Sequence, residues 1–118
     1  MVFDDRGMTC MKDFQDLLLY QEEREDIWIH IRASLLDGRL TVSGHEIGKA
    51  VAEFWGNDEY EYWYAFGSDE TEKLMDVIDG TDDPEGALMM NFGGSDGCGK
   101  LREICESNGI RYRFDSYV

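Results

Sequence analysis

The sequence predicts a single α+β domain over residues 1–118, in which an antiparallel or mixed sheet of about four strands has helices packed on one face. Two segments of alternating apolar and polar residues flank Asp37 and Gly38, and an aromatic-rich segment follows at 60–66. Beyond Gly67 the apolar residues recur at helical spacing instead. Since 42% of the 118 residues are hydrophobic, the chain is long enough and apolar enough to bury a core.

The first element expected is a short helix over residues 11–20. Phe14, Leu17 and Leu18 stand at helical spacing in this segment. The charged run 21–26 follows, and we interpret it as the exit of the chain into solvent.

Residues 27–43 are predicted to form a β-hairpin, because two runs of alternating apolar and polar residues flank Asp37 and Gly38. Asp-Gly in this position is the signature of a two-residue type I′ turn, since both central residues need a positive φ. The two strands then bury the same face. The cross-strand pairs expected are Leu35 with Leu40 and Ala33 with Val42.

Residues 60–66 predict a third strand, since aromatic side chains suit a pleated surface. Between the hairpin and this strand, residues 44–48 are interpreted as a strand end or a bulge. Residues 50–54 are interpreted as a short helical segment, and residues 55–58 as a turn. One side of the third strand is expected to carry Tyr60, Tyr62, Tyr64 and Phe66.

Three helical segments are expected after Gly67, followed by a last strand at 110–117. Polar residues that cap helices, proline in a first turn and glycine after a last turn mark the ends of each segment. The boundaries expected are Ser68 or Asp69 to Gly80, Pro84 to Gly93, and Ser95 to Gly109.

The charge of the chain points to binding rather than catalysis. Acidic residues outnumber basic residues by 26 to 11, and the formal net charge is −15. Excess negative charge opposes folding by self-repulsion, but it raises solubility and the rate of capture of a positively charged partner. Two interpretations stay open, a basic protein partner and the plain solubility of an acidic protein. Direct nucleic-acid binding is disfavoured, because neutralising phosphates needs a basic surface.

The cytoplasm is the expected compartment. Apolar stretches are much shorter than the roughly 20 residues of a membrane span, and acidic residues stand near the N-terminus where a secretory signal has basic ones. Residues 1–10 are interpreted as disordered or as the product of an upstream start, since later methionines offer alternative starts. Cys10, Cys98 and Cys105 are odd in number and lack Cys-x-x-Cys spacing, so buried free thiols are expected.

No residue pattern in the sequence predicts a catalytic site, a cofactor or a metal. His30 and His45 lie outside any nucleophile motif, and they are expected to face each other across the hairpin, where Glu46 could join them around a metal. This set is too small for a convincing site, so a polar pair on the exposed sheet face is favoured. The acidic segment 79–90 fails as a calcium loop, because proline stands where glycine is needed. The glycine-rich segment 91–99 lacks a phosphate-binding pattern.

Acidic and large aromatic residues are interleaved over 53–64, which indicates a protein-binding surface. Carboxylates supply steering charge, while Trp and Tyr supply anchors that lose their water on binding. Part of the aromatic set is expected to pack in the core instead, and the later acidic residues are alternative contacts. The candidate partner-binding residues are Trp55, Asp58, Glu59, Tyr60, Glu61, Asp69, Glu70, Glu72, Asp82 and Asp83.

Three segments resemble the immunity proteins of bacterial contact-dependent inhibition and other polymorphic toxin systems. They are Asp-Gly-Arg-Leu-Thr-Val-Ser-Gly at 37–44, Glu-Phe-Trp-Gly at 53–56 and Tyr-Glu-Tyr-Trp-Tyr at 60–64. The resemblance implies an acidic domain that binds a toxin, frequently a nuclease, and blocks or distorts its active site. It assigns no binding residue, because such proteins have unrelated folds and divergent surfaces.

The leading hypothesis is therefore a non-enzymatic immunity protein that neutralises a cognate basic toxin domain. The second is a nucleic-acid mimic or regulatory adaptor that occupies a basic groove of another protein. A small enzyme is the third. The oligomeric state stays open.

Overall fold

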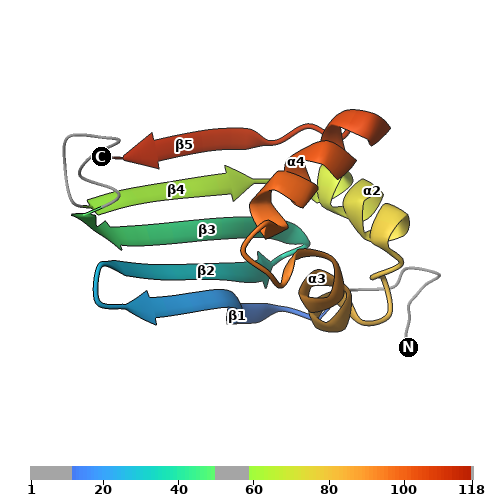
Figure 1. The fold of residues 1–118 in the computed structure, drawn as a ribbon. Helices are drawn as coiled ribbons and strands as arrows, with labels where there is room; N and C mark the ends of the chain where they lie inside the picture. The colour runs from blue at the N-terminus through green and yellow to red at the C-terminus, as the bar shows by residue number, and fades with distance from the viewer. Residues whose placement is uncertain (1–11, 50–58, 118) are drawn as a thin grey trace.

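The structure is a computed structural model, and residues 12–49 and 59–117 are described here. These residues form a five-stranded antiparallel sheet, whose strands follow one another in the order of the sequence, and three helices between the last two strands (Figure 1). The elements are β1 (Phe14–Arg24), β2 (Ile27–Leu36), β3 (Arg39–Gly48), β4 (Glu59–Ala65), α2 (Ser68–Ile78), α3 (Pro84–Phe92), α4 (Gly97–Asn108) and β5 (Arg113–Tyr117).

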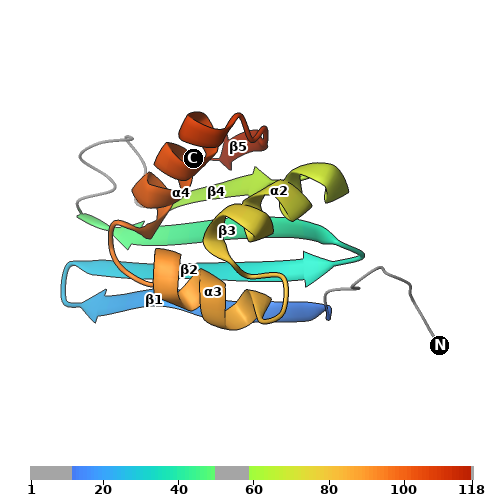
Figure 2. The ribbon, with the colours of Figure 1, turned by 90° about the vertical axis from the view of Figure 1, so that its right-hand side faces the viewer.

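All three helices cover the same face of the sheet, as the two ribbon views show (Figures 1 and 2). α2 contacts β3, and α3 contacts β1. This arrangement confirms the predicted α+β fold with helices on one face. We call the face under the helices the inner face and the opposite one the outer face.

The helix predicted over residues 11–20 is wrong, because Phe14–Arg24 forms the strand β1. β1 pairs with β2, and the register shifts between Phe14 and Leu17 and again between Leu18 and Tyr20. Each irregularity adds a residue to one strand, so inward-facing residues lie three apart and imitate helical spacing. The sheet therefore has five strands rather than about four.

The predicted hairpin is confirmed in turn and in register. Asp37 and Gly38 have φ values of 56° and 74°, as a type I′ turn requires. Leu35 lies opposite Leu40, and Ala33 lies opposite Val42. β3 continues without a register shift and ends at Gly48, so residues 44–48 are the end of the strand, as one of the two interpretations had it, and contain no bulge. The segments predicted at 50–54 and 55–58 lie outside the described residues.

The predicted third strand is confirmed as β4, and its tyrosines Tyr62 and Tyr64 are buried on the inner face. β5 is shorter than predicted and pairs only with β4 within the described chain, so it forms an edge of the sheet. All of its residues are exposed.

The helix ends agree with the sequence in part. α3 begins at Pro84, and α4 ends at Asn108 with the left-handed Gly109, whose φ is 66°, as its C-cap, as predicted. α2 and α4 instead have Gly67 and Asp96 as their N-caps. α2 ends one residue earlier than predicted, at a left-handed Asp79.

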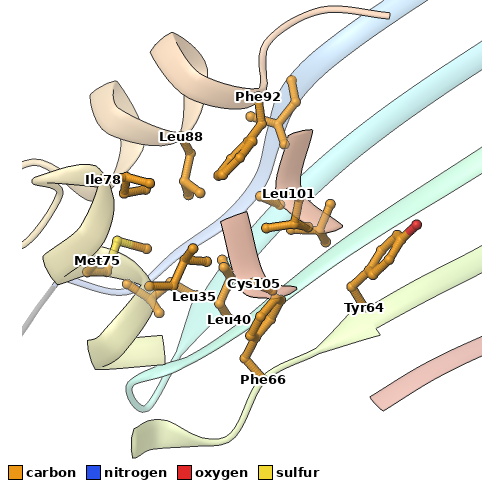
Figure 3. Packing of buried hydrophobic residues seen from close by; sticks show 14 of the residues in the cluster. Leu35, Leu40, Tyr64, Phe66, Met75, Ile78, Leu88, Phe92, Leu101 and Cys105 are labelled. Atoms are coloured by element: carbon orange, nitrogen blue, oxygen red, sulfur yellow. The ribbon is translucent and has the colours of Figure 1, made fainter. Parts of the chain in front are cut away.

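The core lies between the helices and one end of the sheet (Figure 3). Cys105 is a buried free thiol, as predicted, and Cys98 is half-buried; Cys10 lies outside the described residues. Among the described residues, no helix is long and apolar enough to cross a membrane. The side chains that meet in the core come from β2, β3, β4, the residue that follows β4, and all three helices: Leu35, Leu40, Tyr64, Phe66, Met75, Ile78, Leu88, Phe92, Leu101 and Cys105.

Candidate functional site

The structure divides the predicted partner-binding residues between two sides of the sheet. Glu59 and Glu61 project from the outer face of β4, whereas Tyr60 alternates with them and lies on the inner face. The helical candidates lie on α2 and on the turn before α3, over the inner face. Trp55 and Asp58 lie outside the described residues. The helical residues concerned are Asp69, Glu70, Glu72, Asp82 and Asp83.

A continuous series of exposed carboxylates follows α2 and the turn into α3. The buried side of α2 carries Thr71, Leu74, Met75 and Ile78, so the residues between them face solvent. Val77, which stands between buried positions of α2, is also 43% exposed. We call this series the acidic helical surface, and its members are Asp69, Glu72, Asp76, Asp79, Asp82, Asp83 and Glu85.

Three members of the acidic helical surface, Glu72, Asp76 and Asp79, are unfavourable for the stability of α2. Glu72 and Asp76 are four residues apart and repel each other across one turn of helix. Asp76 lies in the last turn of α2 and Asp79 caps it, at the negative end of the helix dipole, and no basic residue stands in that turn. Asp76 was not among the predicted contacts, although its spacing from Glu72 could have indicated it.

Two of the predicted contacts have structural roles of their own. Glu70 accepts a hydrogen bond from the backbone N–H of Arg111 at 2.6 Å and one from Lys73 at 3.1 Å. These bonds lower the pKa of Glu70, the first being the larger cause. Glu70 thus ties α2 to the segment that leads into β5. Asp83 caps α3 by accepting a hydrogen bond from Gly86 N–H at 3.1 Å.

A cleft of about 430 Å³ opens beside the helices, between the N-terminal half of α4 and the inner face of the sheet. Tyr62 lies in it, and its hydroxyl is 3.7 Å from the Cys98 Sγ. Arg102 donates a hydrogen bond to the Tyr64 hydroxyl at 2.5 Å. The remaining lining residues are Tyr20, Ile29, Ile31, Glu46, Tyr60, Ser95, Asp96, Gly99 and Phe114.

Burial disfavours the charged forms of three titratable groups in this cleft. Burial raises the pKa of the Cys98 thiol and of the Tyr62 phenol. Cys98 is therefore a thiol rather than a reactive thiolate at neutral pH. Burial also raises the pKa of Glu46, and a hydrogen bond from Tyr62 offsets part of this shift.

Replacing Glu46 with glutamine is expected to stabilise the protein at neutral pH. A carboxyl group whose pKa is higher in the folded state binds more protons when folded, so it costs stability as the pH rises above its ordinary pKa. The expected gain is about 0.5 kcal/mol, because solvent screens a half-buried group, and it should disappear in acid. Urea unfolding of both proteins across acidic and neutral pH measures the gain. The exposed Glu106→Gln is the control, and a loss of stability in Glu46→Gln at neutral pH would contradict the expectation.

The histidines face each other as predicted, but Glu46 does not join them. His30 lies opposite His45 on the outer face, while Glu46 lies on the inner face among the tyrosines. The combination of these histidines with Glu46 around a metal is therefore wrong, because neighbouring residues of a strand point to opposite faces. His45 lies instead beside Glu59 and Glu61 of β4.

Comparison with known proteins gives no relative from which a role can be transferred. No protein-family model, curated protein or solved structure matches this chain. The function has to be inferred from the chemistry of its surfaces, since a fold does not define a function.

Proposed function

We propose that this chain is a non-enzymatic immunity protein that binds a basic toxin domain through the acidic helical surface, with the cytoplasm as its expected compartment. One observation carries the proposal. The carboxylates of this surface are all exposed and extend over adjoining elements, and Lys73 is the only basic residue of the segment 68–92. Lys73 is paired with Glu70, which is not part of the surface.

The cost of the acidic helical surface supports a role in binding. Carboxylates at the C-terminal end of α2 and at helical neighbour positions each lower helix stability by a few tenths of a kcal/mol or more. Solubility alone does not need them in these positions, because acids elsewhere on the surface serve it equally well. A basic partner surface turns the same repulsion into attraction and accelerates association.

Apolar groups among the carboxylates provide the other part of an interface. Val77 is 43% exposed beside Asp76, and Met89 is 42% exposed one helical turn after Glu85. Protein interfaces combine charges that steer the approach with apolar side chains that lose water on contact. The surface therefore has both components that an inhibitor needs.

The test measures association with the purified product of the gene adjacent to the gene for this chain, which the proposal expects to be a basic toxin. Glu72→Gln with Asp76→Asn is expected to slow association about tenfold at low salt, and the difference should shrink as salt screens the charges. Glu103→Gln with Glu106→Gln removes the same charge from exposed sites on α4 and is the matched control, with a change of less than about twofold expected. Because the first pair of substitutions also relieves repulsion, it should not lower the free energy of unfolding.

Three outcomes would contradict the proposal. The adjacent gene product fails to bind, its association rate does not depend on salt, or both variants slow association equally. A row of carboxylates would also suit the alternative, a nucleic-acid mimic or regulatory adaptor in a basic groove. In that case a short DNA duplex should compete for the partner, and the partner should be a nucleic-acid-binding protein other than a toxin.

A further inference from the structure

The outer face of the sheet brings three side chains of metal-ligand type together, away from the acidic helical surface. In the pairing of β3 with β4, His45 lies opposite Glu61, and Glu59 lies one pair further along on the same face. One ligand atom from each of the three residues lies within 4.8 Å of the others. His45 Nε2 and Glu59 Oε2 form a hydrogen bond at 2.6 Å.

The surroundings leave these ligand atoms available to a cation. Among the ion pairs of the described residues, neither Glu59 nor Glu61 contacts a lysine or arginine. The side chains of His45 and Glu59 are 31% and 52% exposed, so an ion bound there keeps positions open for water or for a partner's side chain. All three residues stand on paired strands, which hold ligands in place better than loops do.

His30 lies close by but does not belong to this set. One of its ring nitrogens is 2.8 Å from Glu23 Oε2, and the other is 3.2 Å from Arg32 Nη2. Both nitrogens are therefore occupied, and the guanidinium repels a second cation. The His30 ring also stacks on Trp28 with a centroid distance of 3.9 Å.

The chemistry of the ligands selects the class of metal. One imidazole and two carboxylates suit Zn²⁺ and related divalent transition metals, whereas Mg²⁺ and Ca²⁺ prefer ligands that are all oxygen. We propose that His45, Glu59 and Glu61 form a binding site for a divalent transition-metal ion, with Zn²⁺ as the ion tested first. This site is independent of the proposed binding of a toxin.

The structure also supplies a spectroscopic reporter for the site. Trp28 meets the His45 ring edge-on, with a centroid distance of 5.2 Å. A paramagnetic ion such as Ni²⁺ bound to His45 should therefore quench the fluorescence of Trp28. Trp28→Phe should remove this part of the quenching and leave the affinity for Zn²⁺ within about twofold, because Trp28 is not a ligand.

The experiment titrates tag-free, chelator-treated full-length protein with Zn²⁺ by calorimetry, and with Ni²⁺ by fluorescence. One ion per chain is expected, and excess Mg²⁺ should not displace it. His45→Ala and Glu61→Gln should each weaken binding at least about tenfold. His30→Ala and Glu46→Gln are the matched controls, one a histidine on the same face and one an acid on the opposite face, and both should bind within about twofold of the wild type.

Three results would contradict the proposed metal site. They are no saturable binding by the wild-type chain, equal binding by His45→Ala, or displacement of Zn²⁺ by Mg²⁺, which would indicate attraction to the acidic surface in general. If His45→Ala does not fold, Glu59→Gln and Glu61→Gln together replace it, since glutamine keeps the shape of glutamate. No toxin is present in this assay. Absence of metal binding would therefore contradict the metal site without bearing on the proposed binding of a toxin.

Discussion

Gly44→Val is expected to destabilise the protein by about 3 kcal/mol, because it forces a side chain into a packed position. Gly44 lies opposite Tyr62 in the β3–β4 pair. A Cβ built on Gly44 would overlap the Cζ, Oη and Cε1 atoms of the Tyr62 ring. Tyr62 is 7% exposed and its hydroxyl is near Cys98, so the ring cannot move without breaking other contacts. Glycine is thus required at position 44 because the Tyr62 ring lies against its Cα, and not because the backbone has a positive φ there.

Urea unfolding compares Gly44→Val with Gly67→Ser. Gly67 has extended backbone angles, a Cβ added to it would meet no atom within 4 Å, and serine is a good N-cap for α2. The control should therefore change the free energy of unfolding by less than about 0.5 kcal/mol. Gly44→Val should cost less in a Tyr62→Ala background than in the wild type, because that background lacks the ring that the valine meets. An unchanged stability in Gly44→Val would show that Tyr62 does not pack on this glycine.

Thr71→Val is expected to cost about 2 kcal/mol, although valine has nearly the same shape. Thr71 is fully buried in α2. Its hydroxyl accepts a hydrogen bond from Leu40 N–H at 3.0 Å and donates one to the Gly67 carbonyl at 2.8 Å. Without the hydroxyl, the N–H of Leu40 is left buried without an acceptor, which costs more than the loss of an exposed hydrogen bond. This one side chain joins the first half of α2 to the start of β3.

Urea unfolding and amide hydrogen exchange together test this role. In Thr71→Val the amide of Leu40 should exchange faster than in the wild type. Thr71→Ser keeps the hydroxyl and loses only a methyl group, so it should cost about 1 kcal/mol and leave Leu40 protected. Equal protection of Leu40 in both variants would rule out the Thr71 hydroxyl as its partner.

The part of the fold that was predictable from the sequence depends on local chemistry. Asp37 and Gly38 define their turn through a positive φ, and the turn sets the register of the strands on both sides. Pro84 and Gly109 mark helix ends for equally local reasons. β1 was not predictable in this way, because its bulges interrupt the period of two by which strands are recognised.

For the acidic helical surface and the proposed metal site, the sequence predicts which acidic residues are candidates but not how they are grouped in space. Alternation within β4 is enough to separate Tyr60 from Glu59 and Glu61. It does not say which residue of β3 lies opposite Glu61, because the pairing of strands joined by a longer connection is decided by the whole sheet. The grouping of these acids with His45, and their separation from the acids of α2, therefore become visible only in the tertiary structure.

The place of β5 at the edge of the sheet has a consequence for the order of folding. β1 to β4 are neighbours in both sequence and space, so each can join the growing sheet by a short-range pairing. Three helices separate β4 from β5 in the sequence. Pairing β5 with β4 therefore closes a long loop, and this closure costs more entropy than the pairing of strands joined by a short turn. We therefore expect the meander of β1 to β4 to form first. The pairing of β5 with β4, which closes the segment that contains the helices, is expected last.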